Sequence, residues 1–275
     1  MSKTTRTGFI IITATTRPDD VKGKIAGFMT SPVTLFIQCL LDAFHPEACQ
    51  SILDVFRRLN ISVIIPEDQT CCGQPAFNSG YRREAGRAAR HFLDVFQKAD
   101  IIVCPSGSCV YMIRHHYPLL FQNDRVRLNQ AREIGSRIYE FSEFLVDVLG
   151  IVDVNAAYSG RVTYHDSCHL ARGLGIREQP RQLIRHVRGA ELVEMPDSDR
   201  CCGFGGGFSF KYADISAALV DDKVNAILAS GADTVVGCDM GCLMNIEGRL
   251  SRTGSAVRVM HLAELLVQGG ITART

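Results

Sequence analysis

Eleven cysteines, and the spacing between ten of them, are the residues of this sequence whose chemistry is most distinctive. Two adjacent pairs, each followed by glycine, occur as Cys71-Cys72-Gly73 and Cys201-Cys202-Gly203. One cysteine lies 32 or 33 residues before each pair, two more follow it, and the two sets are offset by 129 to 134 residues throughout. The sets are Cys39, Cys71, Cys72, Cys104 and Cys109, and then Cys168, Cys201, Cys202, Cys238 and Cys242. We therefore interpret the chain as two copies of one thiolate-rich binding unit.

Thiolates in this pattern can bind zinc or iron–sulfur clusters. Structural zinc takes four ligands in a tetrahedron, and an adjacent cysteine pair would strain such a mononuclear site. A multi-iron cluster spreads its ligands over several metal atoms, so two neighbouring thiolates can each hold a different iron. The pattern favours iron–sulfur clusters over zinc. The glycines Gly73, Gly203 and Gly205 are predicted to let backbone amides approach the sulfurs.

Two other interpretations of these residues are weaker. The glycine run that ends at Gly207 could cradle a phosphate, but it does not complete the dinucleotide-binding fingerprint. A disulfide framework fits poorly with adjacent cysteines and an odd total, and the first 30 residues lack the features of a secretory signal. Free thiols and a reducing compartment are therefore expected.

Length and composition are those of a globular protein. The 275 residues are 46% hydrophobic and 21% charged, with a net charge of +1 that gives no argument for nucleic-acid binding. No apolar run approaches the roughly 20 residues of a membrane span. We predict a tail of unknown role at 1–30, a first cysteine-rich repeat at 31–125, a connecting helical segment at 126–158 and a second repeat at 159–270.

Short apolar runs rich in β-branched residues alternate with amphipathic segments. Strands are predicted at 33–39, 61–65, 101–103, 162–165, 191–193, 234–236 and 257–260, and helices between them include 46–59, 81–99, 138–148 and 215–228. This alternation predicts an α/β fold: two pseudo-symmetric Rossmann-like lobes, with mostly parallel sheets and helices on both faces. Each cysteine of the first set follows a strand, so the carboxyl edge of one sheet can gather them all.

Several other side chains are candidates for a catalytic or binding role. His165 and His169 flank Cys168 and could move a proton or contact a carboxylate substrate. Arg172 could pair with a carboxylate in bidentate fashion, and His261 lies at the end of a predicted strand on the site edge. Each of these also has a purely structural interpretation, and Cys49 is expected to be a small buried residue of a helix.

Longer motifs surround the cysteines: CPSGSC (Cys104 to Cys109), HDSCHLAR (His165 to Arg172), CCGFGGGFSFK (Cys201 to Lys211) and DMGCLMNIEGRL (Asp239 to Leu250). From about residue 32 to 268 the chain resembles the cysteine-rich CCG family. That family includes the B subunit of heterodisulfide reductase and iron–sulfur subunits of glycolate oxidase and anaerobic glycerol-3-phosphate dehydrogenase. The motifs are most similar to those of its lactate-utilisation members.

The resemblance implies a cytoplasmic protein that works with two partners in oxidising L-lactate, a 2-hydroxy acid, to pyruvate. One partner would carry ferredoxin-type clusters, the other would be a third lactate-utilisation subunit, and this chain would pass electrons. The resemblance also implies two [4Fe-4S] clusters, cubane or non-cubane. In the heterodisulfide reductase relative the closing cysteines are two residues apart. The wider spacings here leave open whether Cys104 and Cys238 are ligands.

Three hypotheses follow. The first is an electron-transfer subunit with one cluster in each half. The second is an enzyme that resembles heterodisulfide reductase or glycolate oxidase and acts directly on a disulfide or 2-hydroxy acid. The third is a scaffold protein stabilised by zinc.

Overall fold

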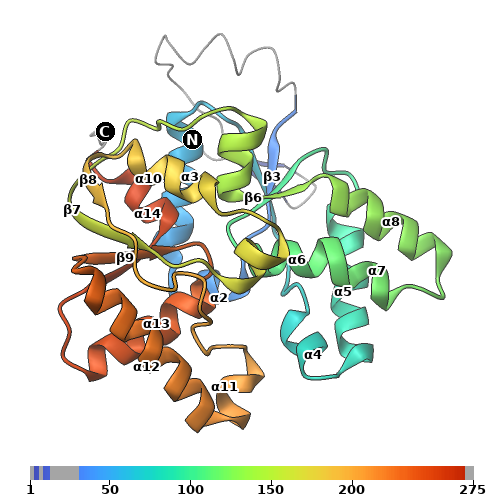
Figure 1. Cartoon of the computed structure of the whole chain (residues 1–275). Coiled ribbons are helices and arrows are strands. Elements are labelled where there is room, and N and C mark those ends of the chain that lie inside the picture. Colours follow the sequence, from blue (N-terminus) through green and yellow to red (C-terminus); the bar gives the residue numbers. More distant parts are fainter. Residues whose placement is uncertain (1–2, 6–8, 13–30, 270–275) are drawn as a thin grey trace. The chain divides into compact units, whose positions relative to one another are not determined.

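A computed structural model describes the backbone of residues 3–5 and 9–12 and the chain from residue 31 to residue 269. It divides into two compact units, residues 1–149 and residues 150–275, which we call the first and second unit (Figure 1). Of the predicted tail, residues 1–2, 6–8 and 13–30 lie outside the described residues.

The first unit is built on a sheet with the strand order β1-β2-β4-β3-β5-β6. Its last four strands in that order are parallel, whereas β1 and β2 pair antiparallel with each other and β2 pairs antiparallel with β4. The strands are β1 (Lys3–Thr5), β2 (Phe9–Ile12), β3 (Val33–Leu35), β4 (Val63–Pro66), β5 (Ile102–Cys104) and β6 (Ile138–Glu140).

The second unit is built on a parallel sheet with the strand order β10-β9-β7-β8. Its strands are β7 (Ala157–Tyr164), β8 (Arg188–Leu192), β9 (Thr234–Gly237) and β10 (Arg258–His261). Taken in chain order, the parallel strands of both units follow the spatial order second, first, third, fourth. The predicted fold class, two α/β lobes with mostly parallel sheets, is confirmed among the described residues.

Helices pack against both faces of the first sheet. Phe36 follows β3 and packs against Phe92 and Phe96 of α5 (Arg82–Phe96), with ring centroids 4.8 and 5.5 Å away. On α3 (Pro46–Arg58), Phe56 meets Phe141 of α9 (Phe141–Glu143) at 5.7 Å. The remaining helical segments are α2 (Cys39–Phe44), α4 (Gln74–Asn78), α6 (Gly107–Tyr111), η1 (Met112–His116), α7 (Tyr117–Leu120), α8 (Arg125–Ser136) and η2 (Phe144–Val148).

In the second unit, α10 (Glu178–Arg185) packs with α14 (Leu262–Val267), and α12 (Ala213–Ser230) packs with α13 (Met240–Arg252). Figure 1 shows these two pairs on opposite sides of the sheet. Gly231, with φ +65°, ends α12 in the left-handed conformation that glycine adopts without steric cost. The two shorter helical segments are η3 (His169–Gly173) and α11 (Gly207–Lys211).

The predicted helix 138–148 is wrong at its start. Residues 138–140 form β6, which pairs with β5 and completes the first parallel sheet. The buried carboxylate of Glu140 then accepts hydrogen bonds from the amides of Ser142 and Glu143 and caps the helical turn that follows. The periodicity of the apolar residues after Glu140 is helical, and a three-residue strand is too short to interrupt that pattern.

Candidate metal centres

The strand order places the cysteines where parallel sheets bind ligands. In each unit the first strand lies beside the third, and the chain leaves these two strands in opposite directions along the sheet. Such a switch point opens a crevice at the carboxyl ends of the strands. In the first unit Cys39 follows β3, Cys104 ends β5 and Cys109 lies in α6. The adjacent pair enters from the loop after β4.

The thiols of the first set lie in mutual contact. The Sγ atoms of Cys72 and Cys109 are 3.4 Å apart, and the thiols of Cys39 and Cys71 are within hydrogen-bonding range. All eleven cysteines are free, and 3.4 Å far exceeds the ~2.05 Å of a disulfide. Cys104 is fully buried and contacts Cys109. All five cysteines of the first set are therefore brought together.

The cysteines of the first set differ in how readily their thiols lose a proton. The pKa of Cys71 falls to about 3, because Cys39 and Cys72 donate hydrogen bonds to its sulfur and outweigh burial. The pKa of Cys72 is raised well above its ordinary value by contact with Cys109 and Cys71 and by burial. The pKa of Cys109 is likewise raised, chiefly by contact with Cys104. The first set thus holds one readily formed thiolate among thiols that resist ionisation.

The second set repeats this arrangement. Contact with Cys201 raises the pKa of Cys168, and the same contact, followed by that of Cys202, lowers the pKa of Cys201 to about 2. The thiols of Cys202 and Cys242 are also in contact. The structure therefore gathers four of the five cysteines here by direct contact. The fifth, Cys238, is fully buried and its Sγ accepts a hydrogen bond of 3.4 Å from the hydroxyl of Tyr164.

A histidine joins the second set. His165 is 1% exposed, and one of its ring nitrogens lies within 4.8 Å of the sulfurs of Cys202 and Cys242. Neither ring nitrogen has an oxygen or nitrogen hydrogen-bond partner among the described residues, and the group within hydrogen-bonding reach is the Cys242 thiol. The pKa of Cys242 is lowered to about 7, first by Cys202 and then, against the effect of burial, by His165.

Both adjacent pairs are held by equivalent hydrogen bonds. The amide of Gly73 lies 3.4 Å from Cys71 Sγ, and the amide of Gly203 lies 3.4 Å from Cys201 Sγ. Both glycines have positive φ, +81° and +83°, which a side chain would strain. A Cβ on Gly203 would also lie 2.5 Å from the carbonyl oxygen of Ser216 in α12. Glycine at these positions lets the chain turn tightly enough to bring each amide to the sulfur two residues before it.

A buried ion network supports the loop that carries the second pair. Arg181, 7% exposed, donates to Asp166 at 2.7 Å and to Glu194 at 2.7 Å. Burial alone would raise the pKa of Asp166, but hydrogen bonds from Arg181 and Ser198 outweigh it and the pKa is lowered. Lys223, fully buried, donates to the carbonyl of Ser198 at 2.9 Å. Side chains of two helices, α10 and α12, thereby hold the loop before Cys201 in place. The spacing of these residues in the sequence did not predict this network.

The donor set fits a multinuclear metal cluster. Each set brings soft sulfur donors together in a buried or half-buried position, with the adjacent pair between the others. The pKa of Cys39, Cys72, Cys168 and Cys202 lies above its ordinary value, first because each thiol is hydrogen-bonded to a neighbouring cysteine, then because of burial and of repulsion between neighbouring thiolates. A cation among the sulfurs removes that penalty.

The other predicted site residues lie in different settings. His169 is half-buried, with Nδ1 3.6 Å from Cys168 Sγ, whereas Arg172 is exposed. The Nδ1 atom of His261 accepts a hydrogen bond of 3.1 Å from the amide of Ala263 and so caps α14. Gly205 has φ +51° in the loop after the second pair. Cys49 is half-buried in α3, and burial raises its pKa to about 12.

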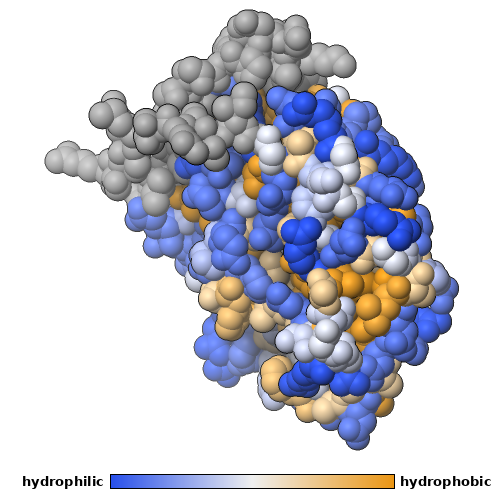
Figure 2. Space-filling model, turned by 90° about the vertical axis from the view of Figure 1, so that its left-hand side faces the viewer, coloured by the Kyte–Doolittle hydropathy of each residue, from blue (hydrophilic) through white to orange (hydrophobic). Residues whose placement is uncertain are grey.

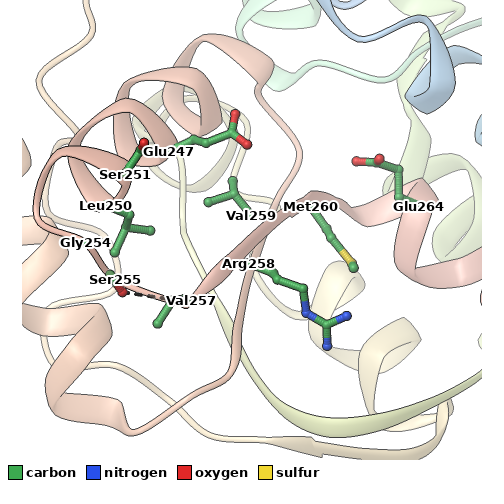
Figure 3. A pocket seen from close by; sticks show the side chains of 10 residues that line it. All are labelled: Glu247, Leu250, Ser251, Gly254, Ser255, Val257, Arg258, Val259, Met260 and Glu264. Atoms are coloured by element: carbon green, nitrogen blue, oxygen red, sulfur yellow. Dashed lines mark hydrogen bonds between the residues drawn. The ribbon is translucent and has the colours of Figure 1, made fainter.

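A hollow of about 570 Å³ lies beside the edge strand β10. Figure 3 shows Glu247 of α13, Arg258 of β10 and Glu264 of α14 among the side chains around it. None of the sequence-predicted site residues lines it. The face drawn in Figure 2 is largely hydrophilic, with apolar side chains gathered in one area. Within the described part of the chain, no helix combines the length and apolarity that crossing a membrane requires.

Known proteins resemble this chain along most of its length. Proteins called lactate utilization protein A are 47% identical in Geobacillus sp. (strain WCH70) and 45% identical in Bacillus subtilis (strain 168). Both matches cover 85% of this chain and 98% of the relative. A hypothetical protein from Helicobacter pylori has a similar fold, with a TM-score of 0.60 and 9% identity over 88% of this chain and 50% of its own.

A family model described as a cysteine-rich domain matches the chain twice, at residues 33–114 and 162–247. The first match begins at β3 and ends beyond Cys109, and the second begins within β7 and ends beyond Cys242. Each match therefore contains one complete set of five cysteines. On these matches and on the identity to its relatives, the chain belongs to the CCG cysteine-rich domain family, among proteins of the lactate utilization protein A type.

Proposed function

We propose that this protein is an iron–sulfur electron-transfer subunit of a complex that oxidises L-lactate to pyruvate. The observation that carries the proposal is the gathering of two duplicated thiol sets, each at the switch point of its own parallel sheet. The names of relatives that share 45–47% of their residues with the chain supply the substrate.

The first cluster would be held by the first set, with Cys39, Cys71, Cys72 and Cys109 as ligands and Cys104 as a fifth donor within contact of Cys109. The second would be held by Cys168, Cys201, Cys202 and Cys242, with Cys238 as the equivalent fifth residue. Two [4Fe-4S] clusters, cubane or non-cubane, are proposed. Such clusters accept and release single electrons.

The chain's own residues hold and tune these sites. The amides of Gly73 and Gly203 point at the sulfurs of Cys71 and Cys201, and hydrogen bonds to ligand sulfurs shift the reduction potential of a cluster. Half of the ten cysteines in the two sets are buried, and the other half are only partly exposed. The sites are thus built to bind metal through thiolates rather than to use a thiolate as a nucleophile.

Oxidation of lactate to pyruvate releases a pair of electrons and a pair of protons, and single-electron carriers must take the electrons in succession. We propose a cytoplasmic complex in which a ferredoxin-type iron–sulfur subunit and a third lactate-utilisation subunit supply the remaining steps. His169, Arg172 and His261 remain candidates for contact with substrate or proton transfer at this chain.

Anaerobic purification followed by iron and sulfide analysis tests the cofactor. We expect about eight iron atoms per chain and a brown protein, because each four-iron cluster takes one set. A colourless protein that contains zinc would support the scaffold interpretation and overturn the proposal.

Lactate-dependent reduction of a dye tests the role in the complex. The isolated chain should reduce no dye, whereas the chain mixed with its two partners should reduce it. Dye reduction by the isolated chain would instead assign the oxidation of lactate to this subunit, in the manner of an enzyme that acts directly on a 2-hydroxy acid.

A further inference from the structure

The two metal centres differ at one position that the duplication makes equivalent. Phe36 lies three residues before Cys39, and His165 lies three residues before Cys168. Their backbones are placed alike: the Phe36 amide donates to Val103 at 2.9 Å, and the His165 amide donates to the equivalent strand at 2.8 Å. Both side chains are buried, at 0% and 1% exposure. One is a hydrocarbon ring, whereas the other is a potential metal ligand.

The surroundings of Phe36 are apolar and suit a phenyl ring. It packs edge-on against Phe92 and Phe96 of α5, as aromatic rings do in a core. His165 has no comparable explanation. A buried imidazole that has no oxygen or nitrogen partner, and only the Cys242 thiol within hydrogen-bonding reach, is disfavoured, because its polar atoms have lost water for at most a weak sulfur contact.

The position of the ring suggests what offsets the free-energy cost of burying the imidazole. A nitrogen of His165 and the sulfurs of Cys202 and Cys242 all lie within 4.8 Å of one another, so three donors surround one small volume. Imidazole nitrogen and thiolate sulfur are both ligands that iron accepts in iron–sulfur proteins. We propose that His165 donates a ring nitrogen to iron in the second cluster, on the side of Cys202 and Cys242, and that the first cluster has no such ligand.

This assignment rests on the proposed function, because it requires a cluster in the second set. It adds that the two clusters are chemically unequal. In the first set Cys104 is a fifth thiol in contact with Cys109, whereas in the second set the equivalent Cys238 accepts a hydrogen bond from Tyr164, and His165 takes the place of the fifth donor. A neutral nitrogen in the place of a thiolate gives a cluster less negative charge, and histidine ligation raises the reduction potential of iron–sulfur centres. The second cluster should therefore have the higher potential of the two.

Nitrogen coupling to the reduced clusters tests the assignment in the anaerobically purified full-length chain. Pulsed electron paramagnetic resonance should detect strong hyperfine coupling from a directly bound nitrogen. Labelling the chain with [15N]histidine should change this coupling, which separates imidazole from backbone amides. The substitution H165F, which installs the residue that the first unit uses at this position, should abolish it.

Two controls sharpen the result. H169F alters the other histidine beside Cys168 and should leave the coupling intact. The double variant C71S/C72S removes the first site and should also retain it. In H165C, a thiolate replaces the nitrogen, so the potential of one cluster should fall while the iron content stays unchanged.

The outcomes separate the two proposals. Clusters that show no histidine coupling, or that keep it in H165F, would overturn the assignment of His165 and leave the electron-transfer function standing. A chain that binds no iron or sulfide would overturn both. If H165F fails to fold, labelling of the wild-type chain and the H165C potential still decide the question.

Discussion

Asn245 donates a hydrogen bond of 2.8 Å from its side-chain amide to the carbonyl oxygen of Cys202. In the first unit the hydroxyl of Tyr117 makes the equivalent bond, 2.9 Å long, to the carbonyl of Cys72. Different residue types on different helices thus hold the same point of each adjacent pair. The second cysteine of each pair is fixed through its backbone as well as through its sulfur.

Removing these donors should loosen one cluster at a time. Asn245→Leu leaves the Cys202 carbonyl without its partner, at a cost of about 1–3 kcal/mol for a buried group. We expect iron release to an anaerobic chelator to be faster from the second site only. Tyr117→Phe should accelerate release from the first site only, and equal acceleration of both sites by either variant would contradict this account.

Each half should load iron independently. C71S/C72S and C201S/C202S should each retain about half of the iron and sulfide of the parent chain, since each set holds a separate cluster. Iron and sulfide analysis after anaerobic purification measures this. C49S serves as the control, because Cys49 lies in α3 outside the duplicated pattern of ten cysteines. Complete loss of iron in either double variant would show that the halves depend on each other.

The buried ion network of Arg181, Asp166 and Glu194 should contribute strongly to the stability of the loop before Cys201. Arg181→Met leaves the 2% exposed Asp166 without its partner, and breaking a buried pair in this way costs about 3–5 kcal/mol. Arg185→Met removes the exposed pair with Glu178 and should cost about 0–1 kcal/mol. Denaturant unfolding of both variants, prepared with equal iron content, measures the difference, and equal midpoints would refute it.

Glu140 should make the first unit less stable as the pH rises. Burial, only partly offset by Ser142 and Glu143, raises its pKa from 4.5 to about 7. The folded state therefore binds the proton more tightly than the unfolded state. The resulting stability is fully present below pH 4.5 and is lost as the pH rises through 7, in total on the order of 3 kcal/mol.

The variant Glu140→Gln tests this dependence, because it keeps the acceptor for the Ser142 and Glu143 amides without a titrating group. Its unfolding midpoint should vary less between pH 5 and pH 8 than that of the parent chain. At pH 8 the variant should also be the more stable of the two. An identical pH profile for both proteins would exclude Glu140 as the source.

Gly203 should tolerate no side chain. Alanine there meets a positive φ of +83° and a carbonyl oxygen 2.5 Å from its Cβ. Gly175 has a similar φ of +74° with nothing within 4 Å, so Gly175→Ala isolates the cost of backbone conformation, about 1 kcal/mol. Gly203→Ala should lower the thermal midpoint further and reduce the iron content, whereas similar behaviour of the two variants would rule out the steric argument.

The sequence predicted most of the framework because cysteine spacing and strand alternation are local patterns that repeat. The strands before Cys39 and Cys104 could be recognised from three to seven apolar residues each. The pairing of β2 with β4 could not, because it joins segments about fifty residues apart without a shared motif. The strand 138–140 was hidden by the helical periodicity of the residues after it.

The site was predicted in its ligand types but not in its supports. Cysteine can be recognised as a possible metal ligand from its residue type alone, so the two sets could be identified from the sequence. His165 was noted for proton transfer or substrate contact. Its position beside Cys202 and Cys242 depends on the three-dimensional fold, and no spacing in the sequence encodes that. In the sequence, Arg181 and Lys223 look like ordinary charged surface residues, and only the structure shows that they are buried.

On the proposed ligation, the exchange of Phe36 for His165 makes the two halves of the duplicated protein unequal as electron carriers. With imidazole at one carrier and a phenyl ring at the equivalent place of the other, an electron is held at lower energy in the second half. A divergence at one position of the repeat would thus give two carriers of similar fold different affinities for an electron.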